Sequence, residues 1–448
     1  MRDLPAAFAR RMRELLREEA GAFFDALDGP SPASIRFNPL KPARDGELPF
    51  RELFDGQVPW CERGAYLRER PSFTLDPLLH GGAYYVQEAS SMFLDHVLRQ
   101  LLHGPSRVLD LCAAPGGKST LGIGLLAGES LWVANEVVAS RAAVLKENVI
   151  KWGSERVVVT RADSSRFAAL PGAFDLVIVD APCSGEGMFR REDGRAVSGW
   201  SEGATRACEA RQRRIARDAW ECVAPGGYLV YSTCTYNPGE NERVLEWIAR
   251  LDGACPVAIS HDFAGIAPGD SPLPCYRFYP HRTRGEGFFT GALRKDDGPR
   301  FALPSRQERL PRVALPAGVE ALVRGSGDHA RYLAGETAGI VPRAHAGFIH
   351  HLERRVGVLY KGCEVAETGG KMAHALALWA GLPRERVETR EVGLETATRF
   401  LRKEEVRLDV PRGEWAIVAY RSVALGWVKG VGGRVNNYYP VEWRVRLG

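Results

Sequence analysis

The sequence predicts an α/β fold built on a parallel sheet, and three observations support this prediction. Between residues 76 and 295, short apolar segments alternate with helical ones, which is typical of repeated β-α units. A glycine-rich loop at residues 110–118 joins one predicted strand to the next helix. Acidic residues and two cysteines directly follow predicted strands, at the edge of such a sheet where ligands bind.

The N-terminal part is predicted to be helical and then extended. Apolar residues recur at helical spacing from Leu4 to Leu27, and the turn residues Gly29 to Pro32 end this helix. A strand is expected from Ser34 to Asn38.

The central part is predicted to consist of short strands and intervening helices. The expected strands span residues 107–111, 131–134, 157–160, 174–179, 228–232 and 288–293. The expected helices span residues 118–126, 139–151, 205–223 and 241–249. This alternation is typical of a parallel α/β sheet.

A domain boundary is expected at about residues 296–315, which are rich in proline, arginine and polar residues. Beyond it, a helix is predicted near Met372 to Trp379. The segment from Trp415 to Arg444 is strand-like with glycine-rich turns, which predicts a small β-rich domain at the C-terminal end.

Composition excludes several classes of protein. The 448 residues suffice for two or three domains, and a net charge of +5 says little about partners. No apolar run approaches the ~18 residues of a membrane span, and residues 1–20 lack the apolar core of a secretion signal. We therefore expect a cytoplasmic location. Nine scattered cysteines without C-x-x-C spacing argue against disulfides and a zinc site.

The loop from Asp110 to Ser119 (DLCAAPGGKS) favours a nucleotide-like ligand, since its glycines allow close backbone approach at the start of a helix. A phosphate-binding P-loop would need glycine where Cys112 stands, and the dinucleotide pattern G-x-G-x-x-G is absent. The remaining interpretation is a loop for S-adenosylmethionine. Its predicted binding residues are Cys112, Ala113, Ala114, Pro115, Gly116, Gly117 and Lys118.

Acidic residues after successive strands support this interpretation. Glu136 is placed to accept hydrogen bonds from ribose hydroxyls, and Asp163 from an adenine amino group. Asp180 ends the next strand, as Asp110 ends the first. The alternative for each is a helix cap or a solvated turn residue.

Two cysteines stand just past neighbouring predicted strands. Cys183 lies in the sequence DAPCSG that begins at Asp180, and Cys234 lies in YSTCTY, which begins at Tyr231. A thiolate is a strong nucleophile, so two thiols in one cleft favour covalent catalysis. The alternative is that both are small buried apolar residues.

The motifs DLCAAPGGK (110–118), DAPCSGEGM (180–188) and YSTCTYNPGENE (231–242) resemble signatures of the Sun-type (Nop/Sun) RNA cytosine-5 methyltransferases. YVQEASSM (85–92) and GEGFF (285–289) match the same family, so the resemblance covers about residues 30–295. It implies a Rossmann-like fold that binds S-adenosylmethionine through residues 112–118, Glu136, Asp163 and Asp180. It also implies that Cys234 is the nucleophile and Cys183 aids product release. DNA cytosine methyltransferases attack from a Pro-Cys cysteine, which would leave Cys234 unexplained.

The implied chemistry explains why cysteine is needed. Carbon 5 of cytosine is too weak a nucleophile to take the methyl group directly, and thiolate attack on carbon 6 raises its electron density. A second cysteine can assist breakdown of the adduct by proton transfer. Asp180 is expected to hold the ring near N3.

Several cations are candidates for contact with RNA phosphates. Five arginines lie on the helix predicted at 205–223: Arg206, Arg211, Arg213, Arg214 and Arg217. Five further residues follow the motif that ends at Met188 or precede Gly285: Arg190, Arg191, His281, Arg282 and Arg284. The alternative is an ordinary solvated surface.

The last segment, residues 424–444, mixes Trp427, Tyr438, Tyr439 and Trp443 with Lys429 and Arg434, which suits stacking on bases and phosphate contact. It resembles the PUA-like module of the bacterial 16S rRNA methyltransferase F branch, although a β-barrel core would also explain the aromatic residues.

The resulting hypothesis is a monomeric, metal-independent rRNA methyltransferase in four parts. These are an N-terminal RNA-binding segment (1–75), a catalytic domain (76–297), a connecting region (298–375) and a PUA-like domain (376–448). Two alternatives are a tRNA cytosine-5 methyltransferase and a ribosome-assembly factor without catalytic activity.

Overall fold

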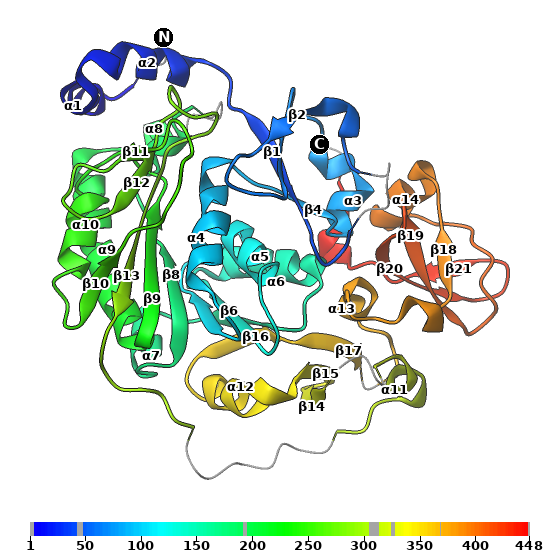
Figure 1. Ribbon diagram of the computed structural model, residues 1–448. Helices are drawn as coiled ribbons and strands as arrows, with labels where there is room; N and C mark the ends of the chain where they lie inside the picture. Colours follow the sequence, from blue (N-terminus) through cyan, green and yellow to red (C-terminus); the bar gives the residue numbers. More distant parts are fainter. Residues whose placement is uncertain are drawn as a thin grey trace.

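A mixed sheet runs through the centre of the protein, as seen in the computed structural model (Figure 1). The structure describes residues 4–42, 48–190, 195–303, 313–323, 328–367 and 369–446. In this part of the chain the sheet has ten strands, and parallel strands form its middle. In spatial order these are β7 (Val157–Arg161), β6 (Leu131–Asn135), β5 (Arg107–Asp110), β8 (Phe174–Asp180) and β9 (Val223–Thr233).

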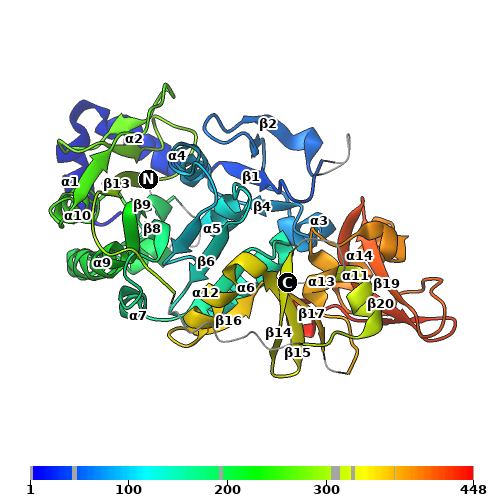
Figure 2. The same ribbon diagram turned by 60° about the horizontal axis from the view of Figure 1, so that its bottom comes forward.

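The middle strands are apolar because both of their faces are covered. Figures 1 and 2 show α4 (Phe93–Leu101), α5 (Gly117–Ile123) and α6 (Ala139–Trp152) on one side. On the other side lie α7 (Ser164–Ala168), α9 (Glu202–Cys222) and α10 (Glu242–Ile248). The predicted α/β fold is therefore confirmed.

Antiparallel strands extend both edges of the sheet. On one side β13 (Phe288–Lys295) pairs with β9, followed by β12 (Cys275–Phe278) and β11 (Ala267–Pro268), while β10 (Ala254–Val257) also pairs with β13. On the other side β16 (Gly357–Lys361) pairs with β7. The region expected only to connect domains thus contributes an edge strand to the central sheet.

The strand order reverses between β5 and β8, which are neighbours although β6 and β7 intervene in the sequence. Helices that follow two such strands lie on opposite faces, so a crevice forms at the carboxyl ends of the strands. Asp110 and Asp180 end β5 and β8 at this crevice.

The N-terminal helix predicted from Leu4 to Leu27 is divided into two. α1 (Ala6–Leu16) and α2 (Ala20–Asp28) are separated by a short 3-10 turn, since Arg17 has a φ of 51° that an α-helix does not allow. The apolar side chains of both helices pack on Phe189, Tyr236 and Tyr279 of the catalytic domain.

A four-stranded sheet follows the two helices, in the order β2 (Phe54–Gln57), β3 (Gly64–Leu67), β1 (Ala33–Phe37) and β4 (Tyr84–Val86). The short helix α3 (Pro77–His80) precedes β4. The boundary proposed after residue 75 therefore falls between two strands of one sheet.

The C-terminal half contains two further sheets. β14 (His329–Ala334), β15 (Thr337–Pro342) and β17 (Cys363–Glu367) form one, beside α11 (Ala317–Val323) and α12 (Ala346–Glu353). β18 (Thr389–Glu391), β19 (Trp415–Tyr420), β20 (Val423–Gly430) and β21 (Val435–Asn437) form the other, with α13 (His374–Leu378) and α14 (Leu394–Leu401). Within the described residues, no helix combines the length and apolar character needed to cross a bilayer.

Candidate active site

A cavity of about 760 Å³ opens at the crevice between β5 and β8. Its walls come from the carboxyl ends of β5, β6, β7 and β8, from the loop after β9, and from residues 85–91, which begin within β4 of the N-terminal sheet. Its volume is in the range of sites for nucleotide-sized ligands. The residues predicted for cofactor binding line this cavity, with the exception of Gly116.

The glycine-rich loop turns sharply from β5 into α5. Gly116 has a φ of +116°, which side-chain-bearing residues rarely adopt. The first turn of α5 is held from outside by Arg36 of β1, whose guanidinium donates to the carbonyl of Gly117 (3.2 Å) and the hydroxyl of Thr120 (2.7 Å). Arg36 also donates to Gln87 (2.8 Å) and lies over the ring of Trp152.

Asp110 is fully buried beneath this loop. Its Oδ2 accepts a hydrogen bond from Ser119 (2.6 Å), while its Oδ1 is buried without a hydrogen-bond partner among the described residues. Burial raises the pKa of Asp110 to about 7. An orphaned acceptor on the wall of the cavity suits a ligand that brings a hydrogen-bond donor.

Glu136 and Asp163 line the same cavity and also make local contacts. Glu136 accepts from the N–H of Val138 (2.9 Å) and pairs with Arg141 (3.2 Å). Asp163 caps α7 and pairs with Arg214 (3.0 Å). Asp163 therefore caps a helix, as one alternative expected, and it also lines the cavity; its contact with the cofactor stays a prediction.

Asp180 pairs with Lys118 across the cavity, at 2.8 Å. Burial acts to lower the pKa of the Lys118 ammonium, but the carboxylate of Asp180 raises it above its ordinary value, and Cys234 adds to this effect. Lys118, predicted only as part of the cofactor loop, thus lies at the end of the cavity that holds the cysteines.

The two cysteines lie together. β8 and β9 are parallel neighbours in which Asp180 is in register with Ser232, so the chain beyond each strand delivers one thiol to the same place. The sulfur atoms of Cys183 and Cys234 are 3.3 Å apart. The contact with Cys234, together with burial, raises the pKa of the Cys183 thiol well above its ordinary value. Cys183 therefore keeps its proton at neutral pH.

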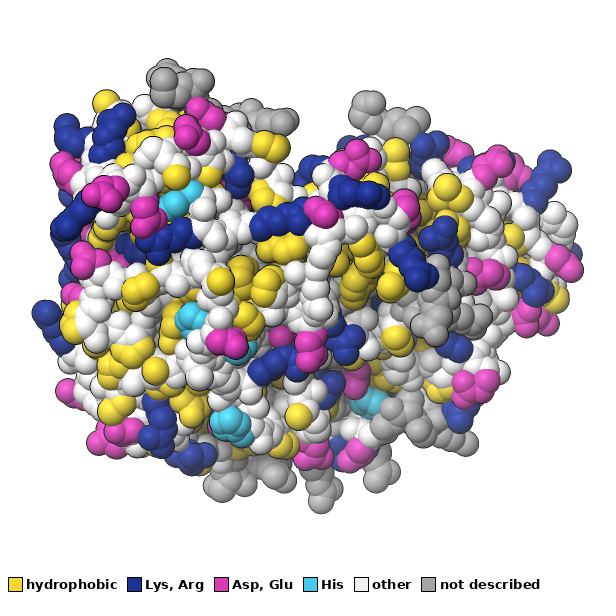
Figure 3. Space-filling view, turned by 45° about the horizontal axis from the view of Figure 1, so that its top comes forward, with side chains coloured by type: hydrophobic (Ala, Val, Ile, Leu, Met, Phe, Trp, Pro, Cys, Tyr) yellow, Lys and Arg dark blue, Asp and Glu magenta, His cyan; other side chains and the backbone are white. Residues whose placement is uncertain are grey.

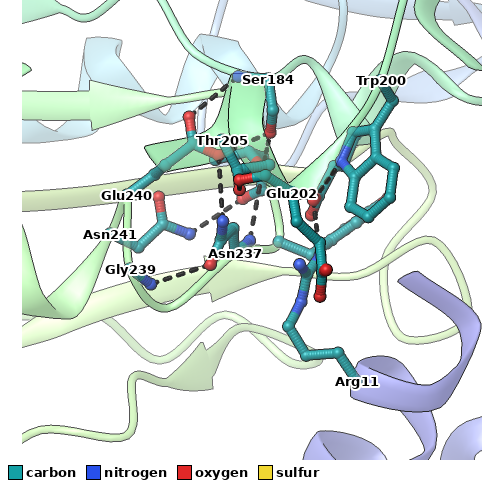
Figure 4. A network of polar contacts seen from close by, with 12 residues as sticks. Arg11, Ser184, Trp200, Glu202, Thr205, Asn237, Gly239, Glu240 and Asn241 are labelled. Carbon is teal, nitrogen blue, oxygen red and sulfur yellow. Dashed lines mark hydrogen bonds and ion pairs between the residues drawn. The ribbon is translucent and has the colours of Figure 1, made fainter. Parts of the chain in front are cut away.

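Polar residues that the sequence analysis did not single out surround the two cysteine loops (Figure 4). Glu240, Ser184 and Gln212 form one set, and Arg11, Glu186 and Trp200 form another. Glu240 lies within the quoted motif YSTCTYNPGENE, but nothing in the pattern reveals which side chain it contacts.

Four of the five arginines of α9 fall into two pairs. Arg211 and Arg214 line the cavity, whereas Arg213 and Arg217 lie over the ring of Trp247. Arg211 and Arg214 thus lie beside the cavity, where the sequence analysis expected cations, and a contact of either with RNA stays a prediction. Figure 3 shows basic and acidic side chains interspersed over the face that it displays.

The other predicted RNA-contacting cations make contacts within the chain, mostly to its N-terminal part, and their contact with RNA stays a prediction. His281 and Arg282 pair with Glu19, and Arg284 pairs with Asp55. Arg190 is buried and donates to two backbone carbonyls. Arg191 lies outside the described residues.

The aromatic residues of the C-terminal segment 424–444 differ in their exposure. Trp427 and Tyr439 are fully buried in the C-terminal sheet domain, so they form core rather than a stacking surface. Tyr438 is half-buried against Trp415, with ring centroids 4.6 Å apart.

Three family models match different parts of the chain. The family described as 16S rRNA methyltransferase RsmB/F matches residues 101–294. The N-terminal domain of 16S rRNA methyltransferase RsmF matches residues 4–89, and the methyltransferase RsmF PUA domain matches residues 388–445.

Individual proteins show the same similarity. The ribosomal RNA small subunit methyltransferase F of Klebsiella pneumoniae is 32% identical over 465 residues, covering 98% of this chain and 96% of that protein. The enzyme of the same name from Pectobacterium atrosepticum is 37% identical over 307 residues, covering 65% of this chain and 63% of that protein. A crystal structure of a methyltransferase homologue from Pyrococcus horikoshii shares 28% identity, with a TM-score of 0.56 over 65% of this chain and 96% of that one.

Proposed function

Because this chain belongs to the 16S rRNA methyltransferase RsmB/F family, we propose that it methylates carbon 5 of a cytosine in 16S rRNA, with S-adenosylmethionine as methyl donor. The observation that carries the proposal is the contact of 3.3 Å between the sulfur atoms of Cys183 and Cys234. Two adjacent thiols on the wall of a ligand-sized cavity supply both a nucleophile and a proton-transfer group.

The residues around the cavity fit the methyl donor. The backbone of residues 112–118 lies against the cavity, and Asp110 offers a buried acceptor without a partner among the described residues. Glu136 is assigned to the ribose hydroxyls and Asp163 to the adenine amino group, because both carboxylates line the cavity beyond the next two strands. When bound, S-adenosylmethionine supplies an electrophilic methyl group.

Cys234 acts as the nucleophile. Its thiolate adds to carbon 6 of the cytosine, and the electron pair of the 5,6 double bond becomes available at carbon 5. Lys118 lies near Cys234 and pairs with Asp180, so both can hold the polar edge of the ring. Asp180 is assigned to the N3 side, where a hydrogen bond favours the activated ring.

Cys183 aids release of the product. Once carbon 5 carries the methyl group, its proton must leave so that the 5,6 double bond can re-form. The sulfur of Cys183 accepts this proton while its own proton passes to Sγ of Cys234, 3.3 Å away. The bond between carbon 6 and Cys234 breaks, its electron pair stays on that sulfur, and both cysteines end as thiols.

The target base must leave its stack to reach Cys234, so an unpaired or easily opened cytosine is expected. The match to the PUA domain of the family supports an RNA partner. A protein that acts on ribosomal RNA is expected in the cytoplasm.

Transfer of a tritiated methyl group from S-adenosylmethionine to 16S rRNA and to small subunits from a deletion strain tests the proposal. Bisulfite sequencing then locates the modified cytosine. Cys234→Ala should abolish methylation, and Cys183→Ala should leave a protein–RNA adduct that survives a denaturing gel. Undiminished turnover of Cys183→Ala without an adduct would contradict the assigned roles.

The same assay separates the alternatives. Label in tRNA and none in 16S rRNA would identify a tRNA methyltransferase. RNA binding without label in any RNA would identify an assembly factor.

A further inference from the structure

The carboxylate of Glu240 connects the two loops that carry the cysteines. Glu240 follows Cys234 in the chain and is fully buried. Its Oε2 accepts the backbone N–H of Ser184 at 2.8 Å, and its Oε1 accepts the Ser184 hydroxyl at 2.6 Å. Ser184 is the residue after Cys183, so both oxygens of the carboxylate hold the Cys183 loop (Figure 4).

A second contact fixes the other side of Cys183. The amide of Gln212, on α9, donates both to Glu240 and to the carbonyl of Pro182, each at 3.0 Å. The peptide unit after Cys183 is therefore held by Glu240 directly. The peptide unit before Cys183 is held by Gln212, which is itself bound to Glu240. Rotation of this loop would break several hydrogen bonds together.

The Cys234 loop is attached to the same carboxylate. The hydroxyls of Ser184 and Thr235 are 2.9 Å apart, and the amide of Asn237 donates to Glu240 at 3.3 Å. The carbonyl of Glu240 accepts the hydroxyl of Tyr231, at the end of β9 (2.6 Å). Through these contacts, the loop that carries Cys183 and the loop that carries Cys234 hold each other in place, and with them the two sulfur atoms.

This carboxylate is costly to bury. Among the ion pairs of the described residues, none involves Glu240, so neutral hydrogen-bond donors alone compensate its negative charge. Burial raises the pKa of the Glu240 carboxyl group. An apolar side chain of similar size would fill the space at lower cost, which argues that the hydrogen-bond geometry is what this position requires.

We propose that Glu240 is a positioning residue for Cys183, which it holds at the distance from Cys234 that the release step requires. This inference rests on the proposed function. It goes further by assigning one step of the cycle, the loss of the carbon 5 proton and the breaking of the bond to Cys234, to a residue that touches neither substrate nor cofactor.

Glu240→Gln tests the inference, because it keeps the shape of the side chain but replaces one acceptor oxygen with a donor that faces Ser184. The first methyl transfer should persist, since the cofactor loop is unchanged and the Cys234 loop keeps the contacts of Thr235 with Ser184 and of Tyr231 with the carbonyl of Glu240. Release should slow about tenfold or more, so that kcat falls and a denaturation-resistant adduct accumulates as in Cys183→Ala. The KM for S-adenosylmethionine should stay the same.

Two further variants sharpen the test. Ser184→Ala removes one hydroxyl and leaves the backbone contact, so it should accumulate adduct to a smaller extent. Glu246→Gln is the matched control, since Glu246 lies on the neighbouring helix α10 and, among the described residues, accepts a hydrogen bond from Ser271 rather than from either cysteine loop. It should behave as the unaltered protein.

The outcomes are distinguishable. An adduct in Cys183→Ala but none in Glu240→Gln, with kcat within about twofold of the unaltered protein, would overturn this inference alone. Equal loss of first transfer and release would also overturn it, because it would indicate a merely structural role. Failure of Cys183→Ala to form an adduct would instead count against the proposed function. If Glu240→Gln does not fold, Ser184→Ala decides by the same measurements.

Discussion

The guanidinium of Arg11, in the first helix, donates a hydrogen bond to the carboxylate of Glu186, in the turn that follows Cys183. Glu186 is fully buried and also accepts from the indole N–H of Trp200 at 2.8 Å. The N–H of the next residue, Gly187, donates to the carbonyl of Cys234 at 2.9 Å. The N-terminal helices therefore support the wall of the catalytic cavity directly.

Arg11→Met should destabilise the protein by about 3 kcal/mol, because it leaves a buried carboxylate without its cation. Arg11→Met combined with Glu186→Gln should recover much of this loss, since no unpaired charge remains. Urea unfolding of the four proteins in the double-mutant cycle measures the coupling. Arg10→Met, an exposed neighbour, is the control. Equal stability of Arg10→Met and Arg11→Met would show that the pair contributes nothing.

Arg36→Met should weaken cofactor binding about tenfold, or about 1.4 kcal/mol. The substitution removes the donors that hold the carbonyl of Gly117 and the hydroxyl of Thr120, so the first turn of α5 loses its attachment to the N-terminal sheet. Calorimetric titration with S-adenosylhomocysteine measures the effect.

Arg63→Met, exposed in the turn before β3 of the same sheet, should leave this affinity unchanged. A folded Arg36→Met protein with ordinary affinity would show that the cofactor loop holds its shape without this contact.

Asp110→Asn should change how stability depends on pH. Burial raises the pKa of Asp110 to about 7, so between about pH 4 and 7 the folded state holds a proton that the unfolded state has lost. The stability from this group is thus fully present below about pH 4 and is lost as the pH rises through 7. Asparagine cannot ionise, so this part of the pH dependence should disappear.

The difference in unfolding free energy between Asp110→Asn and the unaltered protein should therefore shift by roughly 3 kcal/mol in favour of asparagine from pH 5 to pH 8. Denaturant unfolding at the two pH values measures it. Asp175→Asn is the control, because Asp175 lies at the start of β8, away from the cavity at the end of that strand. This substitution also removes an acceptor for the backbone N–H of Arg107. A constant difference across this range would show that Asp110 is ionised throughout.

The sequence predicted those parts of the site that local patterns determine. The apolar strands and their order place Asp110, Asp180, Cys183 and Cys234 at one edge of a sheet, since residues that follow parallel strands share that edge. Residues held by contacts across long stretches of sequence were not accessible in this way. Arg36 reaches Gly117, and Glu240 reaches Ser184, through packing that no periodicity encodes.

The same limit explains the errors. Helical spacing continues through Arg17, where the backbone nevertheless turns, because the two helices must both pack on the catalytic domain. Trp427 fits a stacking surface and a core equally well on composition, and only the folded sheet shows that it is buried.

The arginines of α9 allow a prediction about RNA binding. Arg211 is exposed and lines the cavity. Arg217, on the same helix, lies instead over the ring of Trp247, which belongs to α10. If Arg211 contacts a phosphate near the target cytosine, Arg211→Ala should weaken binding of 16S rRNA and lower the slope of log K against log salt by about one. Arg217→Ala should leave that slope unchanged, because its cation is already engaged with an aromatic ring. Both variants should bind S-adenosylhomocysteine normally, which separates a loss of RNA contact from damage to the cavity. Equal salt slopes for the two variants would mean that the positive charge of α9 acts as a diffuse field and that no single arginine of the helix contacts the strand.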